Sequence, residues 1–372
     1  MQLIGTCIRG FEEYAAQEAK ILGCKVIETR QSRIIIEGGD NCLYILNNYS
    51  RTLNKVMILL ARDIAFNLDD IYRKARSIDY SFIKPDQKFA VRSERSGVHD
   101  FTSIDIARVV GQAIIDSYLE SKGIRLKVDL ENPDLEINAD LIDSELFISI
   151  NTTGNGLNFR EYRVYNHPSS LKPTLAAALI IMSGWDGSKL VDAFTGGGTI
   201  PIEAVLYALS KPVKPSGFFL YKKLSFYDEE KEQRAISVIS KKFEVKKKLI
   251  AIEISPKHIK GAEKNAVSAG VIDYIDFMLN DSVKVVLEEK ARYLVSNPPY
   301  GIRSGRKEKV LKIYELFVKN LENILEEGGQ GVIITTEYTK LAEMLKERGY
   351  KIIKTNVGLH GKLWVGAVLF KS

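Results

Sequence analysis

The tetrapeptide Asn297-Pro298-Pro299-Tyr300 follows the apolar run 293–295 and combines two hydrogen-bond acceptors with an aromatic ring. The Asn297 side-chain oxygen and the Pro298 carbonyl could each accept one N–H of an exocyclic amino group, while the Tyr300 ring stacks on the attached heterocycle. With both hydrogens held, the nitrogen lone pair can point at a sulfonium methyl group. Such a nitrogen is nearly non-basic, so positioning and desolvation matter more than a strong general base. The same four residues are also typical of a turn that closes a strand, and alone they leave both interpretations open.

A glycine loop, Thr195-Gly196-Gly197-Gly198-Thr199, stands earlier in the chain and is preceded by Asp192 at the end of a predicted strand. Glycines between a strand and a helix let the backbone approach a nucleotide cofactor, although alone they are also compatible with a structural turn. Two acids follow at later strand ends: Glu253, where a ribose diol needs an acceptor, and Asp281, in Asn280-Asp281-Ser282, where an adenine amino group does. The combination predicts a cofactor site beside an amine-holding site.

Alternating strands and helices position these motifs from about residue 166 onwards. We expect strands over 190–194, 248–254, 275–279, 292–296, 331–335 and 351–357, and helices over 199–209, 255–270, 308–326 and 337–348. This alternation predicts a parallel, doubly wound sheet. The last strand, 363–370, follows a linker too short for a crossover helix, so the chain should close with an antiparallel hairpin.

The segment 207–247 interrupts this alternation. Its Pro and Gly residues exclude one continuous helix, and we interpret it as an extended crossover between the first two strands. Its aromatic side chains could stack on nucleotides, but core packing under a long loop is the commoner use of such residues. They are Phe218, Phe219, Tyr221, Phe226 and Tyr227.

The N-terminal part has an α+β pattern. Alternating segments such as 32–37 and 89–92 are separated by predicted helices such as 12–22 and 104–121. We expect sheets with helices on one side, and domain boundaries near residues 65 and 160.

The composition is that of an ordinary soluble globular protein. The 372 residues are 45% hydrophobic and 27% charged, so two or three domains are expected. The N-terminus lacks the apolar segment of a signal peptide, so we expect a cytoplasmic location, without membrane association or an obligate protein partner. The cysteines Cys7, Cys24 and Cys42 are odd in number and form no CxxC pair, which argues against a disulfide framework or a zinc site, and we interpret them as buried small hydrophobic residues.

Positive charge is concentrated in the C-terminal part. Residues 1–165 have a net charge of −3 and residues 166–372 a net charge of +9. Arg303, Arg306, Lys307 and Lys309 follow the tetrapeptide directly and would meet a phosphate-rich partner beside the proposed site.

Residues 166–372 resemble the class I S-adenosylmethionine-dependent methyltransferases whose fourth strand ends in a [DNS]PP[YFW] motif. The resemblance implies a Rossmann-like fold and S-adenosylmethionine as cofactor. Members of this group methylate adenine or cytosine in DNA, glutamine amides in proteins, or guanine in RNA. The implied cofactor-binding residues are Asp192, Thr195, Gly196, Gly197, Gly198, Thr199, Glu253, Asp281, Ser282 and Asn297, and the implied catalytic residues are Asn297, Pro298 and Tyr300.

Residues 66–155 are similar to the THUMP domain of RNA-modifying enzymes. The similarity rests on the spaced segments 89–107, Gly111 and 128–134. The flanking residues 1–65 and 156–165 resemble the ferredoxin-like module that accompanies THUMP, and His167-Pro168 resembles the family's lead-in to the methyltransferase domain. On residue type alone, we expect His167 to be an exposed loop histidine.

THUMP domains in this family are held to bind the single-stranded acceptor end of tRNA. Arg92, Arg95 and His99 could contact phosphates, and Phe101 could stack on a base. The resemblance implies a tRNA guanine-N2 methyltransferase acting at position 6 of the acceptor stem, where a paired guanine must be extruded into the site. The group Arg303 to Lys309 could hold the distorted backbone.

Three alternatives remain open. Sister enzymes that act on guanosine 10 usually have Asp as the first residue of the motif, and Asn297 here favours position 6. A DNA amino-methyltransferase would share the C-terminal motifs but would have no use for a THUMP-like part. A non-catalytic RNA-binding protein would not need an intact glycine loop with both acids.

Overall fold

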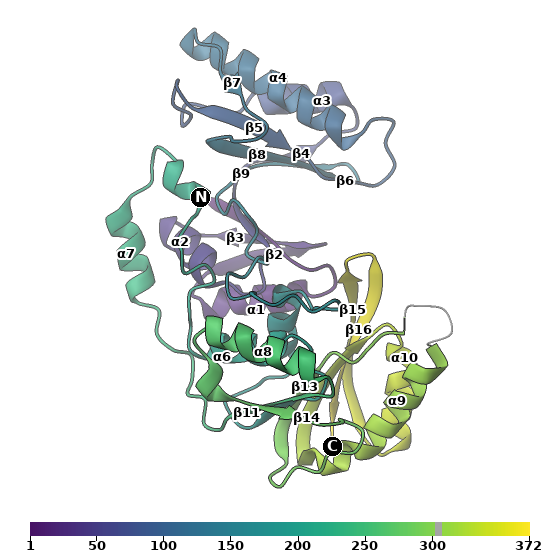
Figure 1. Cartoon of the computed structure of the whole chain (residues 1–372). Coiled ribbons are helices and arrows are strands. Elements are labelled where there is room, and N and C mark those ends of the chain that lie inside the picture. The colour runs from purple at the N-terminus through teal and green to yellow at the C-terminus, as the bar shows by residue number, and fades with distance from the viewer. Residues whose placement is uncertain (302–306) are drawn as a thin grey trace.

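The computed structural model describes residues 1–301 and 307–372, whose strands form two sheets. Figure 1 shows the THUMP-like part at one end of the molecule, the C-terminal sheet at the other, and residues 1–65 between them. The predicted α/β architecture, with an α+β N-terminal part and a Rossmann-like C-terminal part, is confirmed.

The nine strands of the first sheet have the order β2-β3-β1-β4-β9-β8-β5-β7, with β6 also paired to β8. The strands are β1 Gln2–Thr6, β2 Lys25–Arg30, β3 Arg33–Glu37, β4 Lys55–Ile64, β5 Lys88–Arg92, β6 Arg95–Ser96, β7 Lys127–Val128, β8 Leu135–Ile142 and β9 Glu145–Asn151. The helices of this part are α1 Glu12–Ile21, α2 Asp40–Tyr49, α3 Leu68–Arg76 and α4 Ser103–Lys122. Because β4 pairs with β9, the ferredoxin-like and THUMP-like parts share one continuous sheet.

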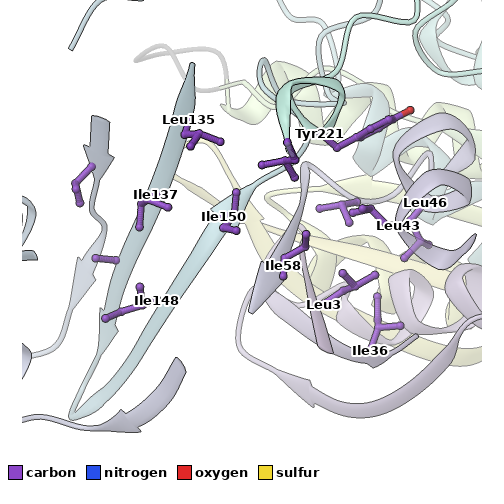
Figure 2. Close-up of a cluster of buried hydrophobic side chains, with 14 of the residues drawn as sticks. Leu3, Ile36, Leu43, Leu46, Ile58, Leu135, Ile137, Ile148, Ile150 and Tyr221 are labelled. Atoms are coloured by element: carbon purple, nitrogen blue, oxygen red, sulfur yellow. The ribbon is translucent and has the colours of Figure 1, made fainter. Parts of the chain in front are cut away.

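The two N-terminal parts also share a hydrophobic core. Figure 2 shows Leu3, Ile36 and Ile58 of the first part in one cluster with Ile137 and Ile150 of the second. All of these side chains are buried, and helices α1 to α4 pack on the same side. The predicted one-sided helix layer is present, but the two parts are not separately packed bodies.

The cysteine prediction was wrong in one respect. Cys24, just before β2, and Cys42, in α2, form a disulfide, whereas Cys7 is free and buried. The Cα atoms of the pair are 5.7 Å apart because α1 and α2 pack on the same face of the sheet. An odd cysteine count with no CxxC spacing does not reveal such tertiary proximity.

The second sheet has the order β12-β11-β10-β13-β14-β16-β15. Its strands are β10 Leu190–Asp192, β11 Leu249–Glu253, β12 Ile275–Leu279, β13 Ala291–Ser296, β14 Leu325–Thr335, β15 Lys351–His360 and β16 Leu363–Lys371. Strands β10 to β14 are parallel, and β16 is antiparallel to both neighbours, which confirms the closing hairpin.

Helices cover both faces of this sheet. Helices α5 Pro173–Met182, α6 Thr199–Ala208 and α8 Pro256–Ser268 contribute to one core cluster, while α9 Lys307–Asn320 and α10 Tyr338–Glu347 contribute to the other. Ser255 accepts a hydrogen bond from the His258 backbone N–H and Pro256 is the first residue of α8, as the sequence indicates. The helix predicted over 308–326 ends six residues early, and β14 begins at Leu325.

The crossover 207–247 returns to the N-terminal part. Its helices are η1 Leu220–Lys223 and α7 Glu229–Ser237, and Figure 1 shows α7 beside α2. Phe219 and Tyr221 are buried in the shared N-terminal core, which confirms core packing for these two aromatic residues. Phe218 and Phe226 remain exposed.

Candidate active site

A cavity of about 900 Å³ lies at the C-terminal ends of β10, β11 and β13. The carboxyl ends of parallel strands share one edge of the sheet, which is why motifs far apart in sequence meet there. The predicted residues that line it are Asp192, Thr195, Gly196, Gly197, Thr199, Glu253, Asp281, Ser282, Asn297, Pro298 and Tyr300. Gly198 does not line the cavity.

Glu253 fixes the glycine loop in place. The Gly196 N–H donates to Glu253 Oε2 at 3.0 Å, and the Ser255 N–H donates to Oε1 at 2.9 Å. Gly198 serves packing, because its φ is +79° and a Cβ there would lie 3.1 Å from the Ala262 Cβ on α8. The loop can therefore bring bare backbone up to a ligand.

Asp192, the last residue of β10, is buried between the glycine loop and the end of β13. Its Oδ1 accepts hydrogen bonds from the Ser296 hydroxyl at 2.7 Å and the Phe194 N–H at 3.2 Å. Its Oδ2 has no hydrogen-bond partner among the residues that the structure describes. Burial raises the pKa of Asp192 to about 7, against the Ser296 hydrogen bond that lowers it. A cationic group placed beside it would satisfy this oxygen.

The tetrapeptide leaves two buried polar atoms unpaired. Asn297 Oδ1 and the Tyr300 hydroxyl have no hydrogen-bond partner within residues 1–301 and 307–372. The Pro299 carbonyl accepts from the Tyr314 hydroxyl at 2.7 Å, which anchors the tetrapeptide to α9. A turn with only a structural role would not be expected to leave such atoms buried and unpaired, whereas a site awaiting a ligand would.

Asp281 and Ser282 follow β12 and differ in availability. Asp281 Oδ1 accepts from the Val283 N–H at 3.2 Å, and the carboxylate stays partly exposed to the cavity. The Ser282 hydroxyl donates to the Ala193 carbonyl, so this side chain joins the segment after β12 to the end of β10.

These residues fit S-adenosylmethionine. Bare backbone at Gly196, carboxylates at Glu253 and Asp281, and the unpaired oxygen of Asp192 offer complementary groups for its sugar, base and ammonium parts. When bound, the cofactor supplies a methyl group on positively charged sulfur. Asn297 would hold the acceptor amine, and the half-buried Tyr300 ring would flank its heterocycle.

His167 is not the exposed loop residue that residue type alone predicts. Its half-buried imidazole lies over the glycine loop, where a Cβ at Gly196 would be 3.4 Å from the ring. Its ring centroid is 4.3 Å from that of His258, whose Nδ1 lies 2.6 Å from the Tyr165 hydroxyl. Burial and His258 lower the pKa of His167. The match of His167-Pro168 to the family lead-in was the available signal.

Lys172 and His360 also line the cavity and were missed. Burial, aided by the charge of Lys172, lowers the pKa of His360 to about 4, so this imidazole is neutral at pH 7. His360 belongs to the β15–β16 hairpin, and no local sequence pattern indicates that this hairpin reaches the cavity.

The predicted RNA-binding residues of the THUMP-like part lie away from the cavity. Arg95 donates to His99 Nδ1 at 3.1 Å, and the His99 and Phe101 ring centroids are 5.2 Å apart, so these three residues gather on one surface. Arg92 stands apart, paired with Glu136 at 3.4 Å and with the Leu130 carbonyl at 2.6 Å. Phe101 also packs against the core.

The basic group after the tetrapeptide is only partly described. Arg303, Arg306 and the side chain of Lys307 lie outside the described residues, while Lys309 is exposed on α9. Their predicted RNA contacts stay a prediction.

Comparisons with known proteins agree with this architecture. Three family models match the chain: the RMKL-like methyltransferase domain over residues 160–365, the THUMP domain over 65–151 and the RlmL ferredoxin-like domain over 2–57. Within the described residues, no helix is long and apolar enough to cross a membrane.

Two archaeal proteins are similar over almost their whole length. The tRNA (guanine(6)-N2)-methyltransferase of Archaeoglobus fulgidus is 38% identical over 374 residues, which cover 100% of this chain and 92% of that protein. The protein of the same name from Methanocaldococcus jannaschii is 37% identical over 357 residues, which cover 92% of each.

A solved structure has the same fold. The crystal structure of a possible methylase from Clostridium difficile 630 superimposes with a TM-score of 0.87 at 26% identity, covering 99% of this chain and 97% of that one. Together with the cofactor-binding geometry, these matches show that the chain belongs to the THUMP-containing branch of the RMKL-like methyltransferase family, whose cofactor is S-adenosylmethionine.

Proposed function

We propose that this enzyme transfers a methyl group from S-adenosylmethionine to the exocyclic N2 amine of a guanosine in tRNA, at position 6 of the acceptor stem. The observation that carries the proposal is the unpaired, buried Oδ1 of Asn297, which lines the same cavity as the glycine loop. This oxygen can accept one amine hydrogen, and the Pro298 carbonyl can accept the other. The nitrogen lone pair then points toward the methyl group.

The THUMP-like part supports tRNA as the nucleic acid. The two archaeal relatives carry tRNA and guanine-6 in their names, and the chain matches them from the N-terminal sheet through the closing hairpin. A DNA amino-methyltransferase would leave the surface of Arg95, His99 and Phe101 without a purpose. An intact cofactor cavity argues equally against a protein that only binds RNA.

Position 6 is supported by the names of these relatives and by Asn297 as the first residue of the motif. Guanosine 10 stays the alternative, because the tetrapeptide would contact only the target base and does not select the stem that carries it. A guanine paired within a stem must leave the helix to reach the cavity.

A methylation assay with matched transcripts tests the proposal. The protein is incubated with labelled S-adenosylmethionine and tRNA transcripts that carry G·C at position 6, A·U at position 6, or A in place of guanosine 10. We expect N2-methylguanosine in the first and third transcripts and none in the second. Product in the second but not the third would assign guanosine 10, and its absence from all three would reject tRNA guanine methylation.

A further inference from the structure

A second cavity, of about 560 Å³, lies between residues 1–65 and the β15–β16 hairpin. We call it the hairpin groove. It is lined by Arg9, Gly10, Glu12, Thr29, Arg30, Gln31, Val357 and Trp364. None of these residues contributes to the cofactor cavity.

The groove has rigid walls. The Leu359 N–H donates to the Arg9 carbonyl at 3.0 Å, and the Asn356 side chain donates to the Gly10 carbonyl at 3.2 Å. A Cβ at Gly10 would lie 2.1 Å from the Val357 carbonyl oxygen, so only glycine permits this approach. The loop before α1 and the hairpin are therefore held in one arrangement.

The acid of the groove is already engaged. The Glu12 carboxylate accepts from the Gly10 N–H at 2.9 Å and from the Ser32 N–H at 2.7 Å. Backbone donors thus offset much of its charge, while the Arg9 side chain has no ion-pair partner among the described residues. The groove consequently favours an anion over a cation.

An exposed tryptophan ring, that of Trp364, lies beside the Arg9 guanidinium. The Arg9 guanidinium lies 5.1 Å from the ring centroid of Trp364, whose side chain is 51% exposed. Exposed tryptophan stacks on nucleic acid bases of any sequence, and a neighbouring arginine contacts phosphate. An acidic peptide would use the arginine but would leave the exposed indole face without a partner.

The groove adjoins the cofactor cavity through the hairpin. Leu363 lines the cavity and Trp364 lines the groove, because neighbouring residues of a strand point to opposite faces. His360 and Gly361, at the turn, line the cavity as well. Figure 1 shows the hairpin reaching from the C-terminal sheet toward the N-terminal part. A strand in the groove could pass one nucleotide over the turn into the cavity.

We propose that the hairpin groove binds the RNA strand next to the target nucleotide, with Arg9 on a phosphate and Trp364 stacked on a base. The proposal rests on the proposed function, since the strand is part of the RNA substrate. It adds a contact surface between the THUMP-like part and the site of methyl transfer.

Binding measurements on the full chain test this surface. Arg9→Ala and Trp364→Ala should each weaken binding of the tRNA transcript about tenfold. Arg9→Ala should also reduce the slope of log Kd against log salt by about one. Cofactor affinity and Tm should stay at wild-type values. Arg348→Ala, which removes an exposed arginine after α10, is the matched control and should bind tRNA as the wild type does.

Tryptophan fluorescence distinguishes RNA contact from a purely structural role of Trp364, because only contact with RNA would change the emission of this residue when tRNA binds. The chain has two tryptophans, and Trp185 is buried. Stacking of a base on Trp364 should quench its emission when tRNA binds, and Trp364→Phe should abolish the quenching while restoring most of the affinity lost in Trp364→Ala.

Two failures can be told apart. If the wild-type protein neither binds nor methylates tRNA, the proposed function is rejected and the groove proposal with it. If the wild type methylates tRNA while Arg9→Ala and Trp364→Ala bind it as tightly as Arg348→Ala, only the groove proposal is overturned. If both variants bind tRNA as the wild type does but bind a polyglutamate peptide more weakly, the groove proposal is overturned in favour of an acidic protein partner.

Discussion

The buried Asn297 Oδ1 has no hydrogen-bond partner among the described residues, and we propose that it accepts a hydrogen of the acceptor amine. We expect Asn297→Ala to lower kcat about 100-fold or more, because a misplaced amine loses its alignment with the methyl donor. The Kd for S-adenosylmethionine should change less than threefold if the cofactor contacts lie mainly on Asp192, Glu253 and the glycine loop. Single-turnover methylation and calorimetry measure the two quantities separately.

Asn297→Asp is the control for this prediction, since it keeps an acceptor oxygen in the same place. We expect its kcat to lie above that of Asn297→Ala. Loss of cofactor binding in Asn297→Ala, instead of loss of turnover, would give Asn297 a role in the cofactor site or in the local fold.

Asp192 is predicted to make the cofactor-free protein less stable as pH rises. Its pKa is raised from 3.8 to about 7 in the folded protein, so between these values the folded state binds more protons than the unfolded state. Stability therefore falls as pH increases from about 4 to about 7. Asp192→Asn should make the difference in Tm between pH 5 and pH 8 smaller.

The same substitution should weaken cofactor binding at pH 8, because it removes the carboxylate that the buried, unpaired oxygen offers to a cationic group. Thermal unfolding without cofactor and calorimetry with cofactor provide the two readouts. Identical pH profiles for the wild type and Asp192→Asn would mean that this carboxyl group titrates normally.

At the scale of elements, the crossover 207–247 is a strap that stabilises the N-terminal part. The Asn48 side chain donates to the Tyr221 hydroxyl at 3.2 Å, and the Tyr221 N–H donates to the Thr152 carbonyl at 2.9 Å. The Tyr221 and Tyr44 ring centroids are 5.3 Å apart. The insertion between β10 and β11 thus contacts both N-terminal parts.

We expect Tyr221→Ala to cost about 3–5 kcal/mol of unfolding free energy, as for other large buried aromatic side chains. Hydrogen exchange should become faster in α2 and α7, which pack together. Phe218→Ala removes an exposed aromatic side chain from the same segment and should stay within about 0.5 kcal/mol of the wild type. Equal effects of the two substitutions would contradict the stabilising role of the segment 207–247.

Local signals explain which elements could be predicted. The glycine loop and Ser255-Pro256 each act over a few residues, and the helices that follow them begin where the sequence predicts them. The short linker predicted over 358–362 correctly indicates a hairpin, but β15 continues three residues further than predicted, to His360. The end of α9 is different, because the Asn320 side chain donates to the Ser282 and Val285 carbonyls on another segment. Such a helix end depends on a tertiary contact and leaves no periodic pattern.

The residues of the site can also be divided into those that the sequence predicts and those that it does not. The tetrapeptide and both acids stand at strand ends, so the rule for parallel sheets brings them together. His360 and Trp364 owe their positions to how far the hairpin extends past the sheet, and Tyr221 owes its burial to partners more than 60 residues away in sequence. The length of the hairpin and the long-range contacts of Tyr221 depend on tertiary packing, which cannot be inferred from a single sequence.

At the scale of the whole molecule, a buried ionic network joins the N-terminal part to the helix of the glycine loop. Glu203 of α6 accepts from Arg51 at 3.0 Å, from Arg160 at 2.9 Å and from the Tyr162 hydroxyl at 2.9 Å. Arg51 follows α2, and its guanidinium also donates to the Lys211 carbonyl at 2.6 Å. This carboxylate therefore adds a buried ionic contact between the N-terminal part and the methyltransferase domain, beside the contacts of the β15–β16 hairpin with Arg9 and Gly10.

The network predicts that the stability of the protein depends strongly on Glu203. Glu203→Gln would leave two buried guanidinium groups without a counter-charge, which costs about 3–5 kcal/mol. Tm should fall on the order of 10 °C. Glu289→Gln, at an exposed carboxylate paired with Lys189 and Lys247, should leave Tm close to the wild-type value, because solvent screens exposed ion pairs. Calorimetric unfolding of both variants measures the difference.

The pH dependence of this deficit follows from the pKa of Glu203. Burial would raise this pKa, but the charges of Arg160 and Arg51 outweigh it and lower the pKa from 4.5 to about 2. The stabilisation is therefore fully present above pH 4.5 and is lost as pH falls through about 2. The difference in Tm between the wild type and Glu203→Gln should stay constant from pH 8 to pH 5 and shrink toward pH 2. A deficit that instead grew on acidification, or that equalled the deficit of Glu289→Gln, would mean that the contact between the parts depends on its apolar side chains and not on the buried carboxylate.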